Sequence, residues 1–104
     1  MTVTVLAPFR LAPGKTEQDL IAASSVFDRD FVSRQPGVLR RELLRKTDGS
    51  YIDVVQFRSQ EDMEEVVGAE MASEVCHAFF AVMDISEGGG RHEVCASLAT
   101  YAPV

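Results

Sequence analysis

The stretch SRQPGVLRRELLRKTDGSYIDVVQFRSQEDMEE, residues 33–65, decides the fold of this chain. Two strand-like runs, 38–46 and 51–58, flank Asp48-Gly49, and Asp-Gly between such runs is among the stronger local signals for a β-hairpin. Ser59 followed three residues later by Asp62 is a helix-capping pattern. The stretch therefore predicts two antiparallel strands followed by a helix.

The N-terminal part of the chain predicts one strand and one helix before this hairpin. The segment TVTVLAPFRL, residues 2–11, is rich in β-branched residues and is followed by the breaker pair Pro13-Gly14. Thr16 and Asp19 form a second capping pattern, and apolar residues then recur at helical spacing until Pro36 ends the helix.

The C-terminal part predicts one long helix and one last strand. The helix that begins at Ser59 carries a single apolar stripe to about Met83. The glycine-rich residues 86–90 read as a mobile connector, and RHEVCASLATYA, residues 91–102, reads as the last strand. The order β-α-β-β-α-β is that of a ferredoxin-like α+β sandwich, with a four-stranded antiparallel sheet and both helices on one face. We expect a single domain over residues 1–104.

Both faces of the predicted sheet carry apolar side chains, although two helices can cover only one face. A two-residue loop at Asp48-Gly49 would place Leu44 opposite Asp53. One face would then carry Leu39, Leu43, Ile52 and Val54, and the other Val38, Leu44, Tyr51, Val55 and Phe57 together with Arg40, Glu42 and Asp53. A second copy of the chain is the simplest cover for the remaining face. The sequence therefore predicts a homodimer packed sheet to sheet.

Composition excludes several classes of partner. The net charge of -6 and the pI of about 4.8 disfavour nucleic acid and anionic membranes, because phosphate binding rests on clustered Lys and Arg. No apolar run approaches the roughly 20 residues of a membrane span. The start MTVTVLAPF does not resemble a signal peptide, so we expect a cytoplasmic protein in which Cys76 and Cys95 are reduced and inert thiols.

Four segments carry a resemblance to a known family: LAPGK (11–15), QPGVLRRELLR (35–45), YIDVVQFRSQEDM (51–63) and SEVCHAFFAVM (73–83). In these segments the chain resembles the dimeric α+β-barrel proteins typified by antibiotic-biosynthesis monooxygenases and haem-degrading monooxygenases. The resemblance covers nearly the whole chain and implies the ferredoxin-like fold and the dimer. It says less about chemistry, because one fold hosts many activities.

The resemblance argues against a haem cofactor. Haem-degrading members use an asparagine, a tryptophan and a histidine at positions that match Ala7, Glu70 and Phe80 of this chain. A phenyl ring cannot ligate iron, and alanine has no hydrogen-bond donor. Members that oxidise quinol-like aromatics need no cofactor, so we expect none here.

Polar residues on the predicted inner strand face form the candidate site. Asp53 or a histidine is the expected general base, and Arg40 and Tyr51 are expected to hold the developing oxyanion. The remaining candidate ligand contacts are Glu42, Phe57, His77 and His92. A structural ion-pair network on the same face is the alternative role for the charged members.

The sequence is compatible with two functions. The first is a cofactor-independent monooxygenase or isomerase acting on a small aromatic compound in the barrel cavity. The second is a non-catalytic module that binds a small apolar ligand or serves in assembly. Glu74 and His77 have metal-ligand spacing, but one helix supplies only a partial site, so we expect no metal.

Overall fold

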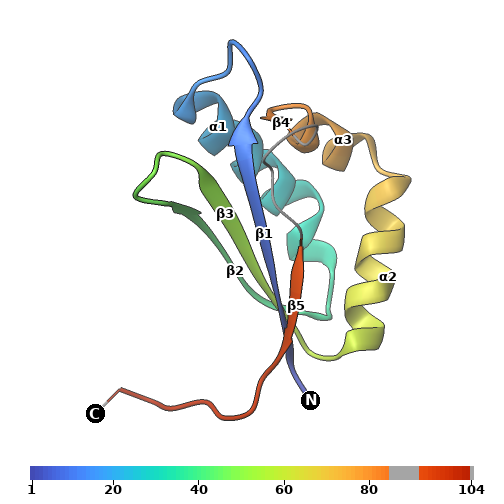
Figure 1. Cartoon of the computed structure of the whole chain (residues 1–104). Helices are drawn as coiled ribbons and strands as arrows, with labels where there is room; N and C mark the ends of the chain where they lie inside the picture. Colours follow the sequence, from blue (N-terminus) through green and yellow to red (C-terminus); the bar gives the residue numbers. More distant parts are fainter. Residues whose placement is uncertain (85–91, 104) are drawn as a thin grey trace.

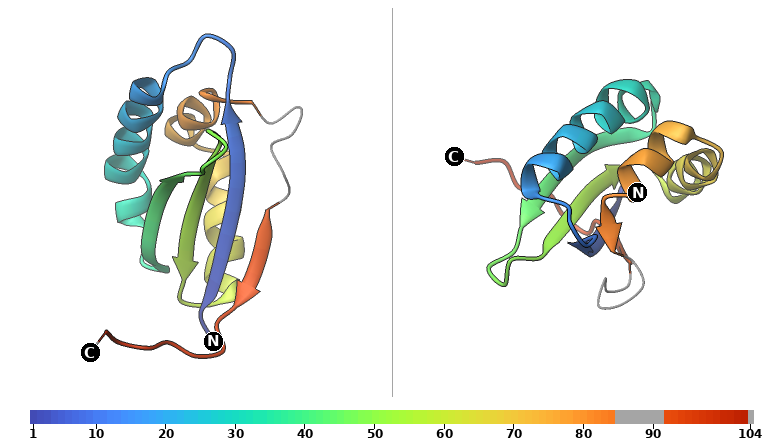
Figure 2. Two further views of the ribbon diagram at one scale, coloured as in Figure 1. Left: turned by 60° about the vertical axis from the view of Figure 1, so that its left-hand side comes forward. Right: turned by 90° about the horizontal axis from the view of Figure 1, so that it is seen from above.

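The computed structural model describes residues 1–84 and 92–103, and the predicted connector at 86–90 lies outside this part of the chain. Its elements are β1 (Val3–Leu11), α1 (Glu17–Asp30), the short 3-10 turn η1 (Val32–Arg34), β2 (Val38–Arg45), β3 (Tyr51–Phe57), α2 (Gln60–Met71), α3 (Glu74–Phe80), β4 (Met83–Asp84) and β5 (Glu93–Ala96). The sheet is antiparallel in the order β2-β3-β1-β4, and β5 also pairs with β1. The helices lie together on one face of the sheet (Figures 1 and 2). The predicted α+β class and ferredoxin-like arrangement are therefore confirmed.

Side-chain caps begin both predicted helices where the sequence places them. Thr16 Oγ1 accepts a hydrogen bond from the Asp19 backbone N–H at 3.2 Å, and the Asp19 carboxylate accepts from the Thr16 N–H at 2.9 Å. Ser59 Oγ accepts from the Asp62 N–H at 3.1 Å. These bonds satisfy backbone donors that have no partner inside the helix, and so they fix the helix starts.

The hairpin loop is one residue longer than predicted, and this reverses the expected faces of β2. Arg45 lies opposite Tyr51, and the Lys46 N–H donates to Ser50 O at 2.7 Å, which leaves three residues in the loop. Gly49 takes the left-handed conformation with φ of 85°, as three-residue hairpin loops require. Leu43, not Leu44, therefore lies opposite Asp53. A shift of one residue exchanges the two faces of a strand, so the predicted register was wrong.

The observed register divides the sheet into two faces, which we call the helix face and the open face. The helix face carries Val3, Val5, Ala7 and Phe9 of β1, Val38, Arg41 and Leu43 of β2, and Tyr51, Asp53, Val55 and Phe57 of β3. The open face carries Thr4, Leu6 and Pro8, Arg40, Glu42 and Leu44, and Ile52, Val54 and Gln56. Asp53 and Tyr51 thus point toward the helices, whereas Arg40 and Glu42 point away from them.

The second helix is broken, and the last strand is shorter than predicted. Ser73 Oγ accepts from the Cys76 N–H at 3.4 Å and starts a new helix, α3, after α2 ends at Met71. Of the segment expected as one strand over 91–102, the described residues 92–102 contribute β5 at Glu93–Ala96, and β4 at Met83–Asp84 pairs with the other end of β1. None of the helices in the described residues is both long enough and apolar enough to cross a membrane.

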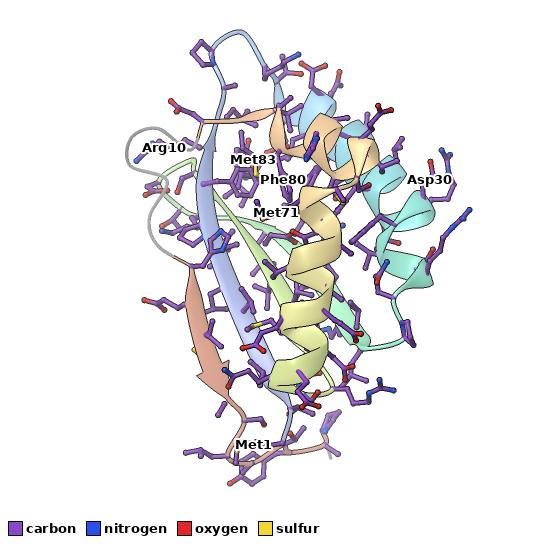
Figure 3. The ribbon with its side chains drawn as sticks, turned by 90° about the vertical axis from the view of Figure 1, so that its right-hand side faces the viewer. Met1, Arg10, Asp30, Met71, Phe80 and Met83 are labelled. Atoms are coloured by element: carbon purple, nitrogen blue, oxygen red, sulfur yellow. The ribbon has the colours of Figure 1, made fainter. Side chains whose placement is uncertain are left out.

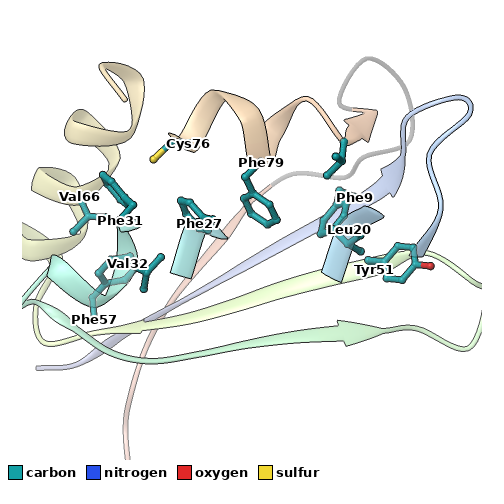
Figure 4. Packing of buried hydrophobic residues seen from close by; sticks show 11 residues of the cluster. Phe9, Leu20, Phe27, Phe31, Val32, Tyr51, Phe57, Val66, Cys76 and Phe79 are labelled. Atoms are coloured by element: carbon teal, nitrogen blue, oxygen red, sulfur yellow. The ribbon is translucent and has the colours of Figure 1, made fainter. Parts of the chain in front are cut away.

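The core lies between the helix face and the helices (Figure 4). Phe27 of α1 stacks on Phe79 of α3 with ring centroids 4.5 Å apart, and Phe9 stacks on Tyr51 at 5.7 Å. Leu20 and Cys76 are fully buried in the same cluster. This packing joins α1 and α3 to the sheet.

Leu20 and its neighbour Ile21 test this assignment of the core. Leu20 is 0% exposed and Ile21 is 53% exposed. Leu20→Ala should lower the free energy of unfolding by about 2–5 kcal/mol, because it removes packed atoms and leaves a cavity. Ile21→Ala, the matched control, should change it by no more than about 0.5 kcal/mol. Denaturant melts would measure both, and equal losses for the two variants would contradict the packing described.

Candidate functional site

A cavity of about 390 Å³ lies between the helix face of the sheet and the helices of the same chain. Its volume falls in the range of about 300–1,000 Å³ that is usual for small-molecule sites. The lining residues are Val5, Ala7, Pro8, Phe9, Phe27, Val32, Val38, Arg41, Asp53, Val55, Phe57, Val66, Val67, Glu70, Phe80, Met83 and His92. Figure 3 looks at the molecule from the side of β1 and α2, and Phe80 and Met83 lie between them in that view.

Four of the lining residues are polar or charged: Arg41, Asp53, Glu70 and His92. The others are aliphatic or aromatic, or in one case methionine. An apolar cavity with a few convergent polar groups is the usual form of a binding or active site. The four polar residues therefore define where chemistry can take place.

Arg41 and Asp53 form a buried ion pair on neighbouring strands. Arg41 Nε donates to both oxygens of the Asp53 carboxylate, at 3.0 and 3.1 Å. The side chains of Arg41 and Asp53 are only 7% and 9% exposed. Leu43 lies opposite Asp53, and Arg41 is two residues before Leu43 on the same strand. Arg41 and Asp53 are therefore diagonal neighbours on the same face of the hairpin. Breaking such a pair is costly because the remaining charge has no counter-charge.

The guanidinium of Arg41 has further partners on the helices. Nη2 donates to Ser24 Oγ at 2.9 Å, and Nη1 lies 3.5 Å from Ser24 O and 3.9 Å from Asp28 Oδ1. The guanidinium carbon lies 4.9 Å from the Phe27 ring centroid and 5.1 Å from that of Phe79, in cation–π range. These contacts fix Arg41 against α1 and α3.

Two opposing effects act on the Asp53 carboxyl. Burial raises its pKa above the ordinary value because it disfavours the charged form. The charge and hydrogen bonds of Arg41 act in the opposite direction, and the charge of His92 also favours the carboxylate. The net direction is upward, so the desolvation of Asp53 outweighs its pairing.

Glu70, in the last turn of α2, reaches the cavity and forms no ion pair with the described part of the chain. Burial is the largest cause that raises its pKa from 4.5 to about 7, and the negative charge of Asp53 adds to it. Arg41 acts in the opposite direction but more weakly. A carboxyl that titrates near neutral pH inside a cavity is suited to accept and return a proton.

The structure brings only some of the predicted site residues together. Asp53, Phe57 and His92 line the cavity. Arg40 and Glu42 lie on the open face, where Arg40 Nη2 donates to Glu42 Oε1 at 3.0 Å. The expected grouping of Arg40 and Glu42 with Asp53 was therefore wrong, because the hairpin register is shifted by one residue.

Tyr51 and His77 also lie apart from the cavity lining. Tyr51 is on the helix face, but its hydroxyl donates to Glu17 Oε1 at 3.0 Å in a separate shallow groove that Arg45 also lines. The exposed His77 has Nε2 2.9 Å from Met71 O. No group of three His, Cys, Asp or Glu side chains is placed to hold a metal ion within 1–84 and 92–103.

Sequence reasoning missed Arg41 and Glu70 as site residues. A three-residue hairpin loop, which Asp48-Gly49 also permits, would have turned Arg41 inward opposite Val55. Glu70 carried a different signal, because the family resemblance matches Ala7, Glu70 and Phe80 to functional positions. All three of these residues line the cavity.

The fold is shared with solved structures of low sequence identity. SnoaB from Streptomyces nogalater, a cofactor-independent oxygenase, is 22% identical over 95% of both chains, with a TM-score of 0.70. A proposed antibiotic biosynthesis monooxygenase from Caulobacter crescentus is 17% identical over 94% of this chain and 91% of its own, with a TM-score of 0.73. A heme-degrading protein from Mycobacterium tuberculosis is 14% identical over 98% of this chain and 100% of its own, with a TM-score of 0.66.

Sequence comparisons add nothing to these likenesses, since neither a protein-family model nor a curated protein sequence matches the chain. The chain has the ferredoxin-like α+β fold of the antibiotic-biosynthesis-monooxygenase-like proteins.

The raised pKa of Glu70 gives a test through stability. The folded state keeps the Glu70 proton between pH 4.5 and about 7, where the unfolded state has released it. The unfolded state binds fewer protons in this window, so Glu70 lowers the free energy of unfolding as pH rises. Glu70→Gln removes this loss. The melting temperature of the variant minus that of the unmodified protein should therefore increase from pH 5 to pH 8. A difference that is constant across this range would contradict the placement of Glu70.

Proposed function

We propose that the protein is a cofactor-independent monooxygenase that acts on a small aromatic compound in the cavity between the sheet and the helices. The observation that carries this proposal is Glu70, a carboxyl with a pKa of about 7 at the polar end of an apolar cavity. The shared fold with SnoaB, a cofactor-independent oxygenase, supports the same reaction class. The fold alone is weak support because it hosts several activities.

Glu70 is the proton acceptor in this proposal, in place of the predicted Asp53. Asp53 accepts both hydrogen bonds from Arg41 Nε, so its carboxylate is already committed. Glu70 removes the hydroxyl proton of a bound phenol and leaves an electron-rich anion that can reduce dioxygen without a cofactor. One atom of dioxygen becomes a new ring carbonyl in place of a ring hydrogen, and the phenol oxygen becomes the second carbonyl of a quinone. The other atom leaves as water, with the displaced ring hydrogen and the proton that Glu70 returns.

The apolar lining serves the same reaction by excluding water from the anion. The aromatic rings of Phe9, Phe27 and Phe57 offer flat surfaces to a planar ligand. Low local polarity also strengthens the effect of the few charges present. His92, which lines the cavity near Asp53, is the second polar contact available to a ligand.

Haem does not fit this set of residues. Phe80 stands where the family resemblance implies the haem ligand, and its side chain has no atom that binds iron. The ring of His77 contacts Met71 O instead of lining the cavity. The proposed reaction therefore uses no haem.

Loss of the Glu70 carboxyl tests the reaction. Quinols and related phenols would be screened under isotopically labelled dioxygen, with label in the product measured by mass spectrometry. Glu70→Gln should lower the rate about 100-fold or more, because it keeps the size of the side chain but cannot take the proton. Glu74→Gln, the same change at an exposed position outside the cavity lining, should leave the rate unchanged.

Equal rates for Glu70→Gln and the unmodified protein would remove Glu70 from the mechanism. Binding of the phenols without any labelled product would favour the non-catalytic alternative.

We also propose that the open face packs against the open face of a second copy. Leu6, Pro8, Ile52 and Val54 are only half-buried within one chain, and Leu44 is 39% exposed. An apolar strip across three neighbouring strands is larger than the scattered apolar residues of an ordinary surface. A self-complementary contact of this strip is the simplest cover.

Val54 and Val55 separate this contact from the fold itself. They are neighbours on β3, but Val54 lies on the open face and Val55 on the helix face. The unmodified protein should show about twice the 11.4 kDa chain mass in light scattering. Val54→Asp should give a folded monomer, whereas Val55→Asp should lower the melting temperature because it places an unpaired charge among the core residues. A monomeric unmodified protein at micromolar concentration would contradict the sheet-to-sheet contact.

A further inference from the structure

Among residues 1–84 and 92–103, two carboxyl groups share one cavity with a single buried guanidinium. Asp53 and Glu70 both line the cavity beside Arg41. Arg41 Nε is fully occupied by Asp53, and its Nη2 is held by Ser24 Oγ. By contrast, the Glu70 carboxyl forms no hydrogen bond or ion pair with residues 1–84 or 92–103. The two carboxyls are therefore unequal, although each is close enough to sense Arg41.

This inequality has an electrostatic consequence for Glu70. An opposite charge favours the ionised form of a carboxyl, and a like charge disfavours it. Arg41 acts on Glu70 in the first sense and Asp53 in the second, and the effect of Asp53 on the Glu70 pKa is the larger of the two. The positive charge of Arg41 thus reaches Glu70 already offset by its partner.

We infer that Asp53 is a positioning residue: by occupying Arg41, it denies Glu70 a counter-ion and keeps Glu70 able to take up a proton. Asp53 itself does not touch the reacting proton. The catalytic consequence rests on the proposed role of Glu70, but the coupling between the two carboxyls does not. It predicts that Glu70 becomes the counter-ion of Arg41, and a much stronger acid, once Asp53 is neutral.

Two further charged groups of the described residues, Asp28 and His92, act on Asp53. Asp28, from α1, and His92, which precedes β5, shift the pKa of Asp53 in opposite directions. Cys76, from α3, is affected by Glu70, but burial is the main cause that raises its pKa. Asp28 is the matched control for Asp53, because its carboxylate also faces Arg41, 3.9 Å from Nη1, but is 56% exposed.

Carboxyl-carbon NMR titrations of the ligand-free protein test the inference, with the Glu70 signal assigned by its loss in Glu70→Gln. In Asp53→Asn the pKa of Glu70 should fall by about one unit or more, a tenfold change in its proton affinity. In Asp28→Asn it should stay where it is in the unmodified protein. The rising limb of the pH–rate profile should move to lower pH with the Glu70 pKa, which a purely structural loss would not cause. An unchanged or higher Glu70 pKa in Asp53→Asn would overturn the inference.

The reciprocal variant keeps the test open if Asp53→Asn does not fold, since removing one partner of a buried pair is costly. Coupling between two titrating groups is mutual, so in the unmodified protein the Asp53 carboxyl signal should show a second step at the pH where Glu70 ionises, and Glu70→Gln should abolish that step. An Asp53 signal without that second step in the unmodified protein, or with the same step in Glu70→Gln, would overturn the coupling. Labelled oxygen in the product without this coupling would support the proposed function and contradict the inference about Asp53. Coupling without labelled product would support the inference and contradict the proposed function.

Discussion

A guanidinium taken out of water needs a counter-charge, and Asp53 supplies it for Arg41 at the boundary between the sheet and the helices. The pair joins β2 to β3, Ser24 attaches it to α1, and the rings of Phe27 and Phe79 cover the guanidinium. These partners come from four elements, so the pair fixes how the helices sit over the sheet. It also determines where the cavity has its polar end, because most of the remaining lining is apolar.

The Arg41–Asp53 pair occupies one of the two carboxyl groups described in the cavity and leaves the other to interact with a ligand. Arg41 and Asp53 satisfy one another, and Glu70 enters the same cavity without such a partner among residues 1–84 and 92–103. A carboxyl in that position can exchange protons near neutral pH. A proton acceptor is what the proposed cofactor-independent oxygenation requires from the protein. The fold is shared with proteins named for oxygenation and for haem degradation. Only the residues of the site can therefore distinguish between such activities.

The sequence was sufficient for the order of the elements and for the caps at Thr16 and Ser59, because these depend on local spacing. It was insufficient for the faces of β2, because Asp48-Gly49 fits loops of two or three residues and each loop turns a different arginine inward. Ser73 carried a capping signal that would have predicted the break between α2 and α3. Glu70 resembles the exposed Glu64 and Glu65 in local sequence, and only the tertiary packing distinguishes it.

The proposed ligand site lies on the helix face, within one chain, and not between the open faces of two chains. Methyl NMR with 2-naphthol as the probe tests this location, because successive side chains on each strand point to opposite faces of the sheet. We expect saturable shifts at Val5, Val55 and Val66, which line the cavity, and none at Leu6, Ile52 and Val54 of the open face. Shifts confined to Leu6, Ile52 and Val54 would contradict it and would move the site to the surface between two chains.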